Sequence, residues 1–404
     1  MKILVINAGS SSIKYQLIDM TDETLLAKGQ CDRIGIEGGN FKHVNIAKDY
    51  THKVDVQMAN HGEGIKLIID ALTNAEYGVI SSMSEINAVG HRVVHGGEKF
   101  SGSVIINDEI IEALKECSEL SPLHNPANLT GIKACTEIMG ENVPQVGVFD
   151  TGFHQTMPDF AYLYAIPYEY YEKYKLRRYG FHGTSHRYVT ARAAEMLGKK
   201  PEEINIVTCH LGNGSSITAV KGGKSFDTTM GVTPLDGLMM GTRSGSIDPA
   251  IIPFLMEKEG LTAKEVDNIL NKKSGILGVS QTTSDNRDIE EGARNGNERY
   301  KLIESMLCHQ ITKYVGGYAA AMGGVDAIVF TGGIGENNPQ YRSRVGKNLE
   351  FMGVKVDEEA NKKAFRTSDE NDISAEGATV KMLVIPTNEE LMIARDTKEI
   401  VEAL

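Results

Sequence analysis

The sequence contains few cysteines and no closely spaced pair of them. Its 404 residues include Cys31, Cys117, Cys135, Cys209 and Cys308, and none of these five belongs to a CxxC motif. An odd number of widely separated cysteines argues against a disulfide framework and against a cysteine-rich metal site. We therefore expect a protein of a reducing compartment, the cytoplasm.

Basic blocks and long hydrophobic runs are also absent. Lys and Arg number 42 against 54 Asp and Glu, which gives a formal net charge of −12. Nucleic acids and membrane surfaces are therefore poor candidates for partners. The most apolar long stretch, residues 314–330, contains four glycines and Asp326, which is unsuitable for a membrane span. A strand pattern begins at residue 2, so we expect no signal peptide and a soluble protein.

A weak long-range repeat predicts two related halves. Residues 3–19 form an apolar strand, a Gly/Ser turn and an alternating second strand, and residues 204–220 repeat that order. A length of 404 residues suits two domains. We expect an N-terminal domain of residues 1–150 that is closed by a C-terminal helix at 388–404, and a second domain of residues 151–387.

Strand and helix patterns alternate along the rest of the chain. Strands that finish in glycines are expected within 86–97 and 326–337, and helices over 110–117 and 185–198. Interleaved strands and helices favour an α/β protein with mixed sheets. Near the C-terminus, Thr387 and Glu390 have the spacing of a capping box for the last helix.

The two Gly/Ser turns are candidate phosphate cradles. Glycine lets the backbone N–H groups approach a phosphate closely, and serine hydroxyls add donors. One such turn is weak support, because hairpins favour glycine in any case, but two at equivalent positions are stronger. The GGKSF segment lacks the first glycine of a P-loop, and GNGSSI lacks the last glycine of a dinucleotide fingerprint. A cradle of the hairpin type resembles that of the actin, hexokinase and Hsp70-like ATPase superfamily.

Four polar residues stand where strands end or glycine-rich loops begin. Arg92 lies in GHRVVHGG, Asp150 closes PQVGVFD, His182 lies in RRYGFHGTSH and Arg243 in PLDGLMMGTRSGSIDP. Side chains at such places face clefts and often serve catalysis.

These segments, together with NAGSSSIK, FDTGFHQTMP, HLGNGSS and PTNEE, closely resemble the acetate kinase family of acyl kinases. The resemblance extends from the first residues to the last helix. It implies two duplicated domains of the actin/hexokinase/Hsp70-like ATPase (ribonuclease H-like) fold, with mixed sheets and a nucleotide cleft between the domains. It also implies a homodimer that transfers the γ-phosphoryl group of ATP reversibly to acetate, giving acetyl phosphate and ADP, with Mg²⁺ or, in its place, Mn²⁺.

The resemblance assigns nucleotide and metal contacts. Metal-site residues are Asn7 and Glu389, and Glu390 is left to the capping box. Residues that face the nucleotide are Ser10, Ser12, Lys14, His210, Leu211, Gly212, Asn213, Gly214, Asp285, Asn286, Arg287, Gly333, Ile334, Gly335, Glu336 and Asn337.

The resemblance also assigns catalysis and substrate binding. Catalytic residues are Arg92, Asp150, His182 and Arg243. Substrate-binding residues are Arg92, Val94, Leu123, Phe181 and Pro234, of which the last four would line an apolar acyl pocket.

Other activities fit parts of the pattern. A propionate or butyrate kinase of the same family is the nearest alternative, an Hsp70-like ATPase module belongs to another class, and a sugar kinase would need a polar sugar site. Two further features are interpreted as structural: His186 as a surface residue at a helix start rather than a zinc ligand with His182, and Arg177 with Arg178 as a solvated pair.

Overall fold

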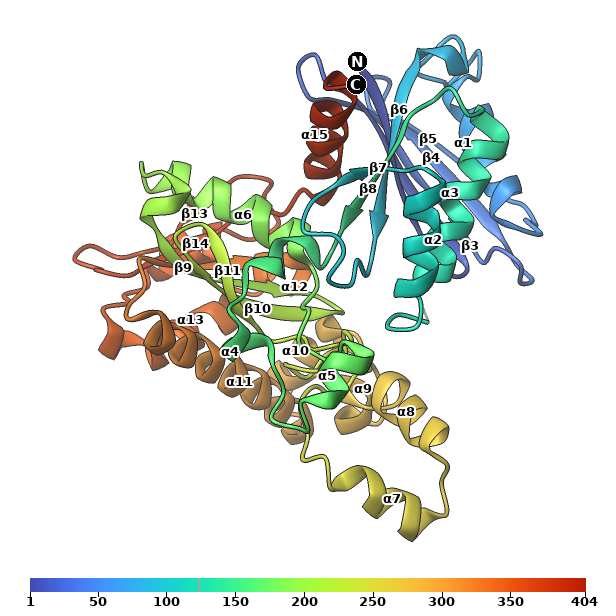
Figure 1. Ribbon diagram of the computed structural model, residues 1–404. Helices are drawn as coiled ribbons and strands as arrows, with labels where there is room; N and C mark the ends of the chain where they lie inside the picture. The colour runs from blue at the N-terminus through green and yellow to red at the C-terminus, as the bar shows by residue number, and fades with distance from the viewer. Residues whose placement is uncertain (123) are drawn as a thin grey trace. The chain divides into compact units, whose positions relative to one another are not determined.

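The computed structural model describes residues 1–122 and 124–404. The chain divides into two compact units, which are built on separate sheets (Figure 1). Unit 1 comprises Met1–Phe153 and Asn388–Leu404, and unit 2 comprises His154–Thr387.

Unit 1 is built on an eight-stranded mixed sheet with the order β5-β4-β3-β2-β1-β6-β8-β7. Strands β1 to β5 are antiparallel neighbours, whereas β1, β6 and β8 run parallel. The strands are β1 (Lys2–Ala8), β2 (Ser12–Asp19), β3 (Thr24–Asp32), β4 (Asn40–Asn45), β5 (Tyr50–Asp55), β6 (Ile86–Val93), β7 (Val104–Ile105) and β8 (Gln145–Phe149).

Helices cover both faces of this sheet, which explains the continuous apolar sequence of β1. Leu4 and Ile6 pack into the core with α1 and α3, while Ile3 and Val5 pack into a second core with α15 (Figure 1). At Gly90 of β6 a Cβ atom would lie 2.5 Å from Thr397 Oγ1 of α15, so this close approach requires glycine. The helices and 3₁₀ turns of this unit are α1 (His61–Leu72), η1 (Met83–Glu85), α2 (Asp108–Cys117), α3 (Asn125–Met139) and α15 (Glu389–Glu402), with η2 (Gly152–Thr156) at the boundary.

Unit 2 is built on a six-stranded mixed sheet with the order β11-β10-β9-β12-β14-β13. Its strands are β9 (Asn205–Leu211), β10 (Ser215–Lys221), β11 (Lys224–Thr228), β12 (Ala327–Thr331), β13 (Asn371–Asp372) and β14 (Lys381–Val384). Its helices and 3₁₀ turns are α4 (Asp159–Tyr162), α5 (Glu169–Tyr174), α6 (Gly183–Met196), η3 (Pro201–Glu203), α7 (Ile251–Glu259), α8 (Ala263–Lys272), α9 (Gly275–Ser280), α10 (Asn286–Arg294), α11 (Glu298–Met322), α12 (Gly332–Asn337), α13 (Pro339–Asn348), η4 (Glu350–Met352) and α14 (Glu358–Lys363).

The two sheets repeat one pattern. In unit 1 an antiparallel set, β3-β2-β1, continues into parallel β6 and β8 and ends in antiparallel β7. In unit 2, β11-β10-β9 continues into parallel β12 and β14 and ends in antiparallel β13. The predicted class, a duplicated α/β fold with mixed sheets, is therefore confirmed, and the repeat at 3–19 and 204–220 corresponds to the hairpins β1–β2 and β9–β10.

The β9–β10 hairpin has one apolar and one polar face. Val207, Cys209 and Leu211 pack into the core together with α11. Alternation along a strand turns Thr208 and His210 to the opposite face, against which α6 packs. The N-terminal turn of α6 and the polar face of this hairpin together build the histidine cluster described below.

The predicted capping box of the last helix is wrong. Asn388 is the N-cap of α15, and its side chain accepts a hydrogen bond from the Leu391 backbone N–H. The Thr387 hydroxyl lies 2.7 Å from Ser185 Oγ within unit 2, so it is engaged elsewhere and does not cap the helix. Asparagine caps a helix at least as well as threonine, so the start of the helix moves by one residue.

Arg177 and Arg178 are not a solvated pair. Arg177 is buried and its guanidinium lies over the Tyr162 ring, while Arg178 pairs with Asp227 and Asp236. Both cations therefore have aromatic or carboxylate partners, which lets them leave bulk water. Within the described part of the chain, none of the helices combines the length and the apolar character that crossing a bilayer requires.

Candidate active site

Arg92 and Asp150 form a partly buried ion pair at one edge of the unit 1 sheet. Arg92 is the penultimate residue of β6 and Asp150 follows β8, and these two parallel strands are neighbours, so their C-terminal ends meet. The guanidinium donates from Nε to Asp150 Oδ1 at 2.9 Å and from Nη2 to Oδ2 at 2.7 Å. Asp150 is only 1% exposed. Such a two-point pair fixes the plane of both groups.

Glu389 extends this cluster from the first residue of α15. Its Oε2 lies 4.0 Å from Arg92 Nε and is buried without a hydrogen-bond partner. Burial raises the pKa of Glu389; Arg92 opposes this effect, and the nearby Asp150 and Glu390 add to it. For Arg92, burial lowers the pKa, but the carboxylates of Asp150 and Glu389 outweigh burial and raise it, so Arg92 is a cation. The cluster thus contains a carboxylate oxygen that is not fully satisfied.

The residues assigned to the metal site would suit a magnesium ion whose other ligands are nucleotide phosphates and water. Among residues 1–122 and 124–404, no group of three or more His, Cys, Asp or Glu side chains is arranged to hold a metal ion. Mg²⁺ commonly takes one or two protein carboxylates and completes its shell with phosphates and water. The orphaned oxygen of Glu389 suits one such ligand, and the Asn7 amide supplies oxygen chemistry of the same kind.

The first Gly/Ser turn joins β1 and β2. The Gly9 backbone N–H donates to the Ser12 carbonyl oxygen at 2.8 Å, which closes a tight turn with Ser10 exposed at its tip. Asn7 and Lys14 are directly opposite each other in the ladder, so their side chains share one face of the hairpin. Lys14 is exposed and available to an anion.

In unit 2, His182 and Arg243 lie over the second glycine-rich turn. A Cβ atom on Gly214 would lie 3.4 Å from His182 Nε2 and 3.6 Å from Arg243 Nη1. The His182 ring stacks on that of His210 with centroids 4.2 Å apart. Arg243 donates to the Pro234 carbonyl oxygen at 3.0 Å, burial lowers its pKa, and within the described ranges it pairs with no carboxylate. A guanidinium without an internal anion is suited to an external one.

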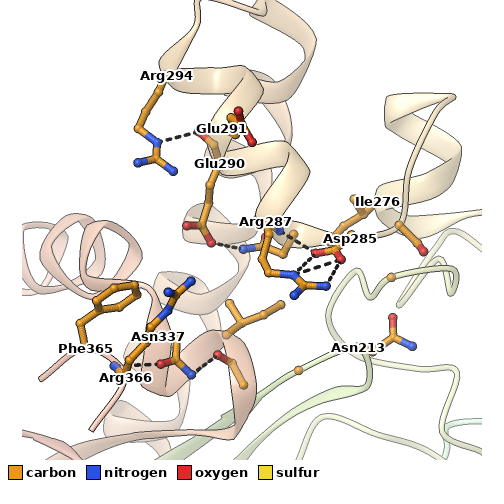
Figure 2. Close-up of a pocket in the computed structure, with 16 residues that line it drawn as sticks. Asn213, Ile276, Asp285, Arg287, Glu290, Glu291, Arg294, Asn337, Phe365 and Arg366 are labelled. Atoms are coloured by element: carbon orange, nitrogen blue, oxygen red, sulfur yellow. Dashed lines mark hydrogen bonds and ion pairs between the residues drawn. The ribbon is translucent and has the colours of Figure 1, made fainter.

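A cavity of about 770 Å³ opens beside this turn (Figure 2). Arg287 and Asp285 form an ion pair at its wall, where Asp285 also caps α10 by accepting the Arg287 N–H. The expected nucleotide residues that line it are Gly212, Asn213, Asp285, Asn286, Arg287, Gly333, Ile334 and Asn337.

Five other expected nucleotide residues of unit 2 are not among the residues that line the cavity: His210, Leu211, Gly214, Gly335 and Glu336. Leu211 belongs to the core, and Glu336 accepts hydrogen bonds from the backbone N–H groups of Gly332 and Thr387. Glu336 therefore holds the backbone around the glycine-rich segment.

Half of the residues that line the cavity were not predicted from the sequence. The additional lining residues are Gly241, Ile276, Ser284, Glu290, Glu291, Arg294, Phe365 and Arg366. The spacing of Asn286, Glu290 and Arg294, four residues apart on α10, could have extended the predicted segment along one helix face. Phe365 and Arg366 carry no motif. The Arg366 N–H donates to Asn337 Oδ1 at 3.0 Å, which ties this segment to α12 (Figure 2).

The residues assigned to the acyl pocket are divided between the units. Val94 is half-buried in unit 1, two residues beyond Arg92, and its N–H donates to Asn128 Oδ1. Phe181 is buried in unit 2, directly before His182, and Pro234 is held by Arg243. Leu123 lies outside the described residues.

The expectation that His186 is a surface residue is wrong. Its side chain is fully buried on α6, where Nδ1 lies 2.7 Å from Thr208 Oγ1 and Nε2 lies 2.7 Å from Ser216 Oγ. The polar face of the β9–β10 hairpin supplies partners for both ring nitrogens, which makes burial of the imidazole favourable.

Comparison with solved structures defines the class of protein. An acetate kinase from Porphyromonas gingivalis superposes with a TM-score of 0.94 at 50% identity and covers 99% of each chain. A propionate kinase from Francisella tularensis superposes with a TM-score of 0.91 at 41% identity, covering 98% of this chain and 99% of the other. The chain is therefore an enzyme of the kinase class.

Sequence comparison then gives the family. The model of the acetokinase family matches residues 2–395. An acetate kinase from Thermoanaerobacterium thermosaccharolyticum is 59% identical over 405 aligned residues, which span 100% of both chains. The chain belongs to the acetokinase family.

Proposed function

We propose that this enzyme transfers the γ-phosphoryl group of ATP reversibly to the carboxylate of acetate, giving acetyl phosphate and ADP. One observation carries the proposal: the 59% identity to an acetate kinase over the full length of both chains. This family membership favours a phosphotransferase over an Hsp70-like ATPase module and over a sugar kinase.

The proposal assigns positioning and charge neutralisation to the protein. Phosphoryl transfer leaves little covalent work for side chains, because the transferring group spreads its negative charge over equatorial oxygens. Arg92, Arg243 and His182 are the donors proposed for that charge. Asp150 holds the Arg92 guanidinium in one plane through its two hydrogen bonds. The 770 Å³ cavity beside the glycine-rich turn is proposed to bind the nucleoside of ATP.

We also propose that the nucleotide binds as its magnesium complex, with Mn²⁺ as a substitute. Glu389 and Asn7 are the residues assigned to that ion, and the unsatisfied buried oxygen of Glu389 supports the assignment. The ion, when bound, supplies positive charge to the phosphate oxygens.

The proposed assembly is a homodimer in the cytoplasm. Large apolar side chains are exposed on short helices and loops of unit 2, among them Phe160, Tyr168, Tyr174 and Phe254. Tyr168 and Tyr174 belong to one segment at α5, and exposed apolar side chains that gather on one surface support a protein interface. All five cysteines are buried and free, which supports a reducing compartment.

A propionate kinase is the second candidate. It is favoured by the likeness to the Francisella tularensis propionate kinase at 41% identity. The two activities differ by one methylene group in the substrate, so the size of the acyl pocket decides between them.

A direct assay with purified full-length protein tests the proposal. ADP formation from ATP is coupled to a dehydrogenase readout with acetate, propionate, butyrate and glucose in turn, with and without Mg²⁺. We expect the highest kcat/KM with acetate, no turnover with glucose and a requirement for the metal. Asp150→Asn protein serves as the matched inactive control, and ATP hydrolysis without any carboxylate would contradict the proposal.

A further inference from the structure

A chain of buried hydrogen bonds leads from His182 into the core of unit 2. His182 Nδ1 lies 2.9 Å from Ser216 Oγ, and the same oxygen lies 2.7 Å from His186 Nε2. His186 Nδ1 lies 2.7 Å from Thr208 Oγ1, and this hydroxyl donates to the Thr218 carbonyl oxygen at 3.5 Å. Ser216, His186 and Thr208 are 0% exposed, so bulk solvent does not compete for these groups.

The single proton of the Ser216 hydroxyl couples the two rings. The hydroxyl has one proton, so when it donates to one imidazole it accepts from the other. Burial lowers the pKa of His186, and the neighbouring His154 and His210 add to this effect, so His186 is neutral and carries one N–H. In the neutral state, therefore, His182 and His186 either both carry their proton on Nδ1 or both carry it on Nε2.

The inner end of the chain favours one direction, in which the Thr208 hydroxyl donates to the Thr218 carbonyl oxygen rather than to His186 Nδ1. A carbonyl oxygen can only accept, so the Thr208 hydroxyl that donates to Thr218 leaves its own oxygen to accept from His186 Nδ1. His186 Nε2 then accepts from Ser216, and Ser216 accepts from His182 Nδ1. We infer that Ser216 and His186 are positioning residues that keep a proton on Nδ1 of His182 and aim its Nε2 at the turn containing Gly214.

This arrangement prepares His182 to act on a phosphoryl group, a step that rests on the proposed function. A lone pair on Nε2 would repel a phosphoryl oxygen, so the ring donates there only after Nε2 takes a second proton from solvent. Ser216 already accepts from Nδ1, so the chain of hydrogen bonds needs no rearrangement. Among the groups of unit 2 that face this ring are the stacked His210, Arg243 across Gly214, and His186 through Ser216.

Ring nitrogen spectroscopy reads the proton positions directly. Full-length protein with ¹⁵N-labelled histidine is examined by NMR at neutral pH, and the His182 signals are assigned from their loss in His182→Ala. We expect both His182 and His186 to carry a proton on Nδ1. In Ser216→Ala, the preference of His182 for Nδ1 should disappear while the circular dichroism spectrum is unchanged. A wild-type His182 that carries its only proton on Nε2 would overturn the inference.

Kinetics separate positioning from a general structural effect. We expect Ser216→Ala to lower kcat roughly tenfold or more, by analogy with the loss of the supporting hydrogen bond of a metal-ligating histidine, with a smaller change in KM for ATP. The matched control is Ser225→Ala, because Ser225 is equally buried and its hydroxyl lies 2.8 Å from Nδ1 of another buried histidine, His154. This control should keep kcat within about twofold.

A double-mutant cycle completes the test. If Ser216 acts through His182, adding Ser216→Ala to His182→Ala should leave kcat unchanged. Equal losses in Ser216→Ala and Ser225→Ala, or a further loss in the double variant, would overturn the inference. Lack of acetate phosphorylation by wild-type protein would overturn the proposed function instead, because the spectra decide the tautomer independently of activity.

Discussion

At the residue scale, the two arginines proposed to bind the transferring phosphoryl group, one in each unit, have different surroundings. Arg92 is paired with a buried carboxylate, whereas Arg243 hydrogen-bonds to a carbonyl oxygen and has no carboxylate partner among the residues described. The same substitution at the two positions therefore has different consequences for the folded protein. Removing Arg92 leaves the Asp150 charge buried and unpaired, while removing Arg243 leaves no charge behind.

We predict that Arg92→Ala and Arg243→Ala both lose activity but only Arg92→Ala loses much stability. Loss of a donor to the transferring phosphoryl group should cost on the order of 3 kcal/mol, which is more than 100-fold in kcat. Arg92→Ala should also lower the free energy of unfolding, by up to about 3 kcal/mol, because it leaves the buried Asp150 carboxylate without its partner. Urea unfolding and steady-state kinetics measure both effects. If a variant keeps more than a tenth of the wild-type kcat, the arginine that it lacks is not a donor to the phosphoryl group.

Asp150 is predicted to orient Arg92 rather than to accept a proton. Acetate is ionised at pH 7, so the nucleophile has no proton to lose. Both oxygens of Asp150 are occupied by Arg92. Asp150→Asn should therefore lower kcat at every pH without removing one limb of the pH profile. If the variant instead abolished an acidic limb whose pKa lies well above that of acetate, Asp150 would be a general base.

Val94 is predicted to limit the size of the acyl substrate. Its backbone N–H is held by the hydrogen bond to Asn128, so truncation of the side chain should enlarge the pocket without moving the backbone. One methylene in a tight apolar pocket is worth about 1 to 3 kcal/mol. Val94→Ala should therefore shift the ratio of kcat/KM values from acetate toward propionate. Val104→Ala, another half-buried valine of unit 1, is the control, and an unchanged ratio in Val94→Ala would refute the assignment.

At the element scale, strand ends were easier to predict than helix surfaces. Arg92 and Asp150 could be placed together because each stands at the C-terminal end of a strand pattern. The burial of His186 could not, because it depends on how α6 meets the polar face of the β9–β10 hairpin. The wall at Phe365 and Arg366 depends on Arg342, whose buried guanidinium donates to the carbonyl oxygens of Gly335 and Ala364. Such long-range contacts leave no local sequence pattern.

The start of α15 gives a prediction about the last helix. Because the Asn388 side chain caps it, Asn388→Ala should lower the free energy of unfolding by about 1 kcal/mol. Glu390→Ala removes only a first-turn acid and should cost a few tenths of a kcal/mol through the helix dipole. Urea midpoints of the two variants compare them directly. If Glu390→Ala lost more stability than Asn388→Ala, the capping box predicted from the sequence would be supported instead.

At the scale of the whole molecule, the duplication could be predicted because two short segments repeat the same strand, turn and strand. The strand order within the two sheets is alike well beyond the repeated segments. The likeness includes the parallel strands and the final antiparallel strand. The strands need apolar side chains toward the helices that cover the sheet, and different residues satisfy that requirement in each unit. Similar layouts therefore persist where the sequences no longer match.

Buried histidines in both units predict how stability depends on pH. Burial lowers the pKa of His91 in unit 1 to about 4, partly opposed by its hydrogen bond to Gln145, and places that of His186 in unit 2 well below the usual value. In the unfolded chain both rings protonate near pH 6.5. Below that pH the unfolded state binds more protons than the folded state, so stability falls as the pH falls toward 4.

The expected size is on the order of 1 kcal/mol per pH unit for each such histidine. Urea unfolding at pH 7.5, 6.5 and 5.5 measures it, and the loss should begin between the last two values, above the range in which ordinary carboxylates titrate. His91→Gln removes one titrating group and should flatten the dependence, whereas His309→Gln, an exposed substitution on α11, should leave it unchanged. Equal slopes in wild-type and His91→Gln protein would show that His91 is protonated in the folded state or that other groups control the acid side.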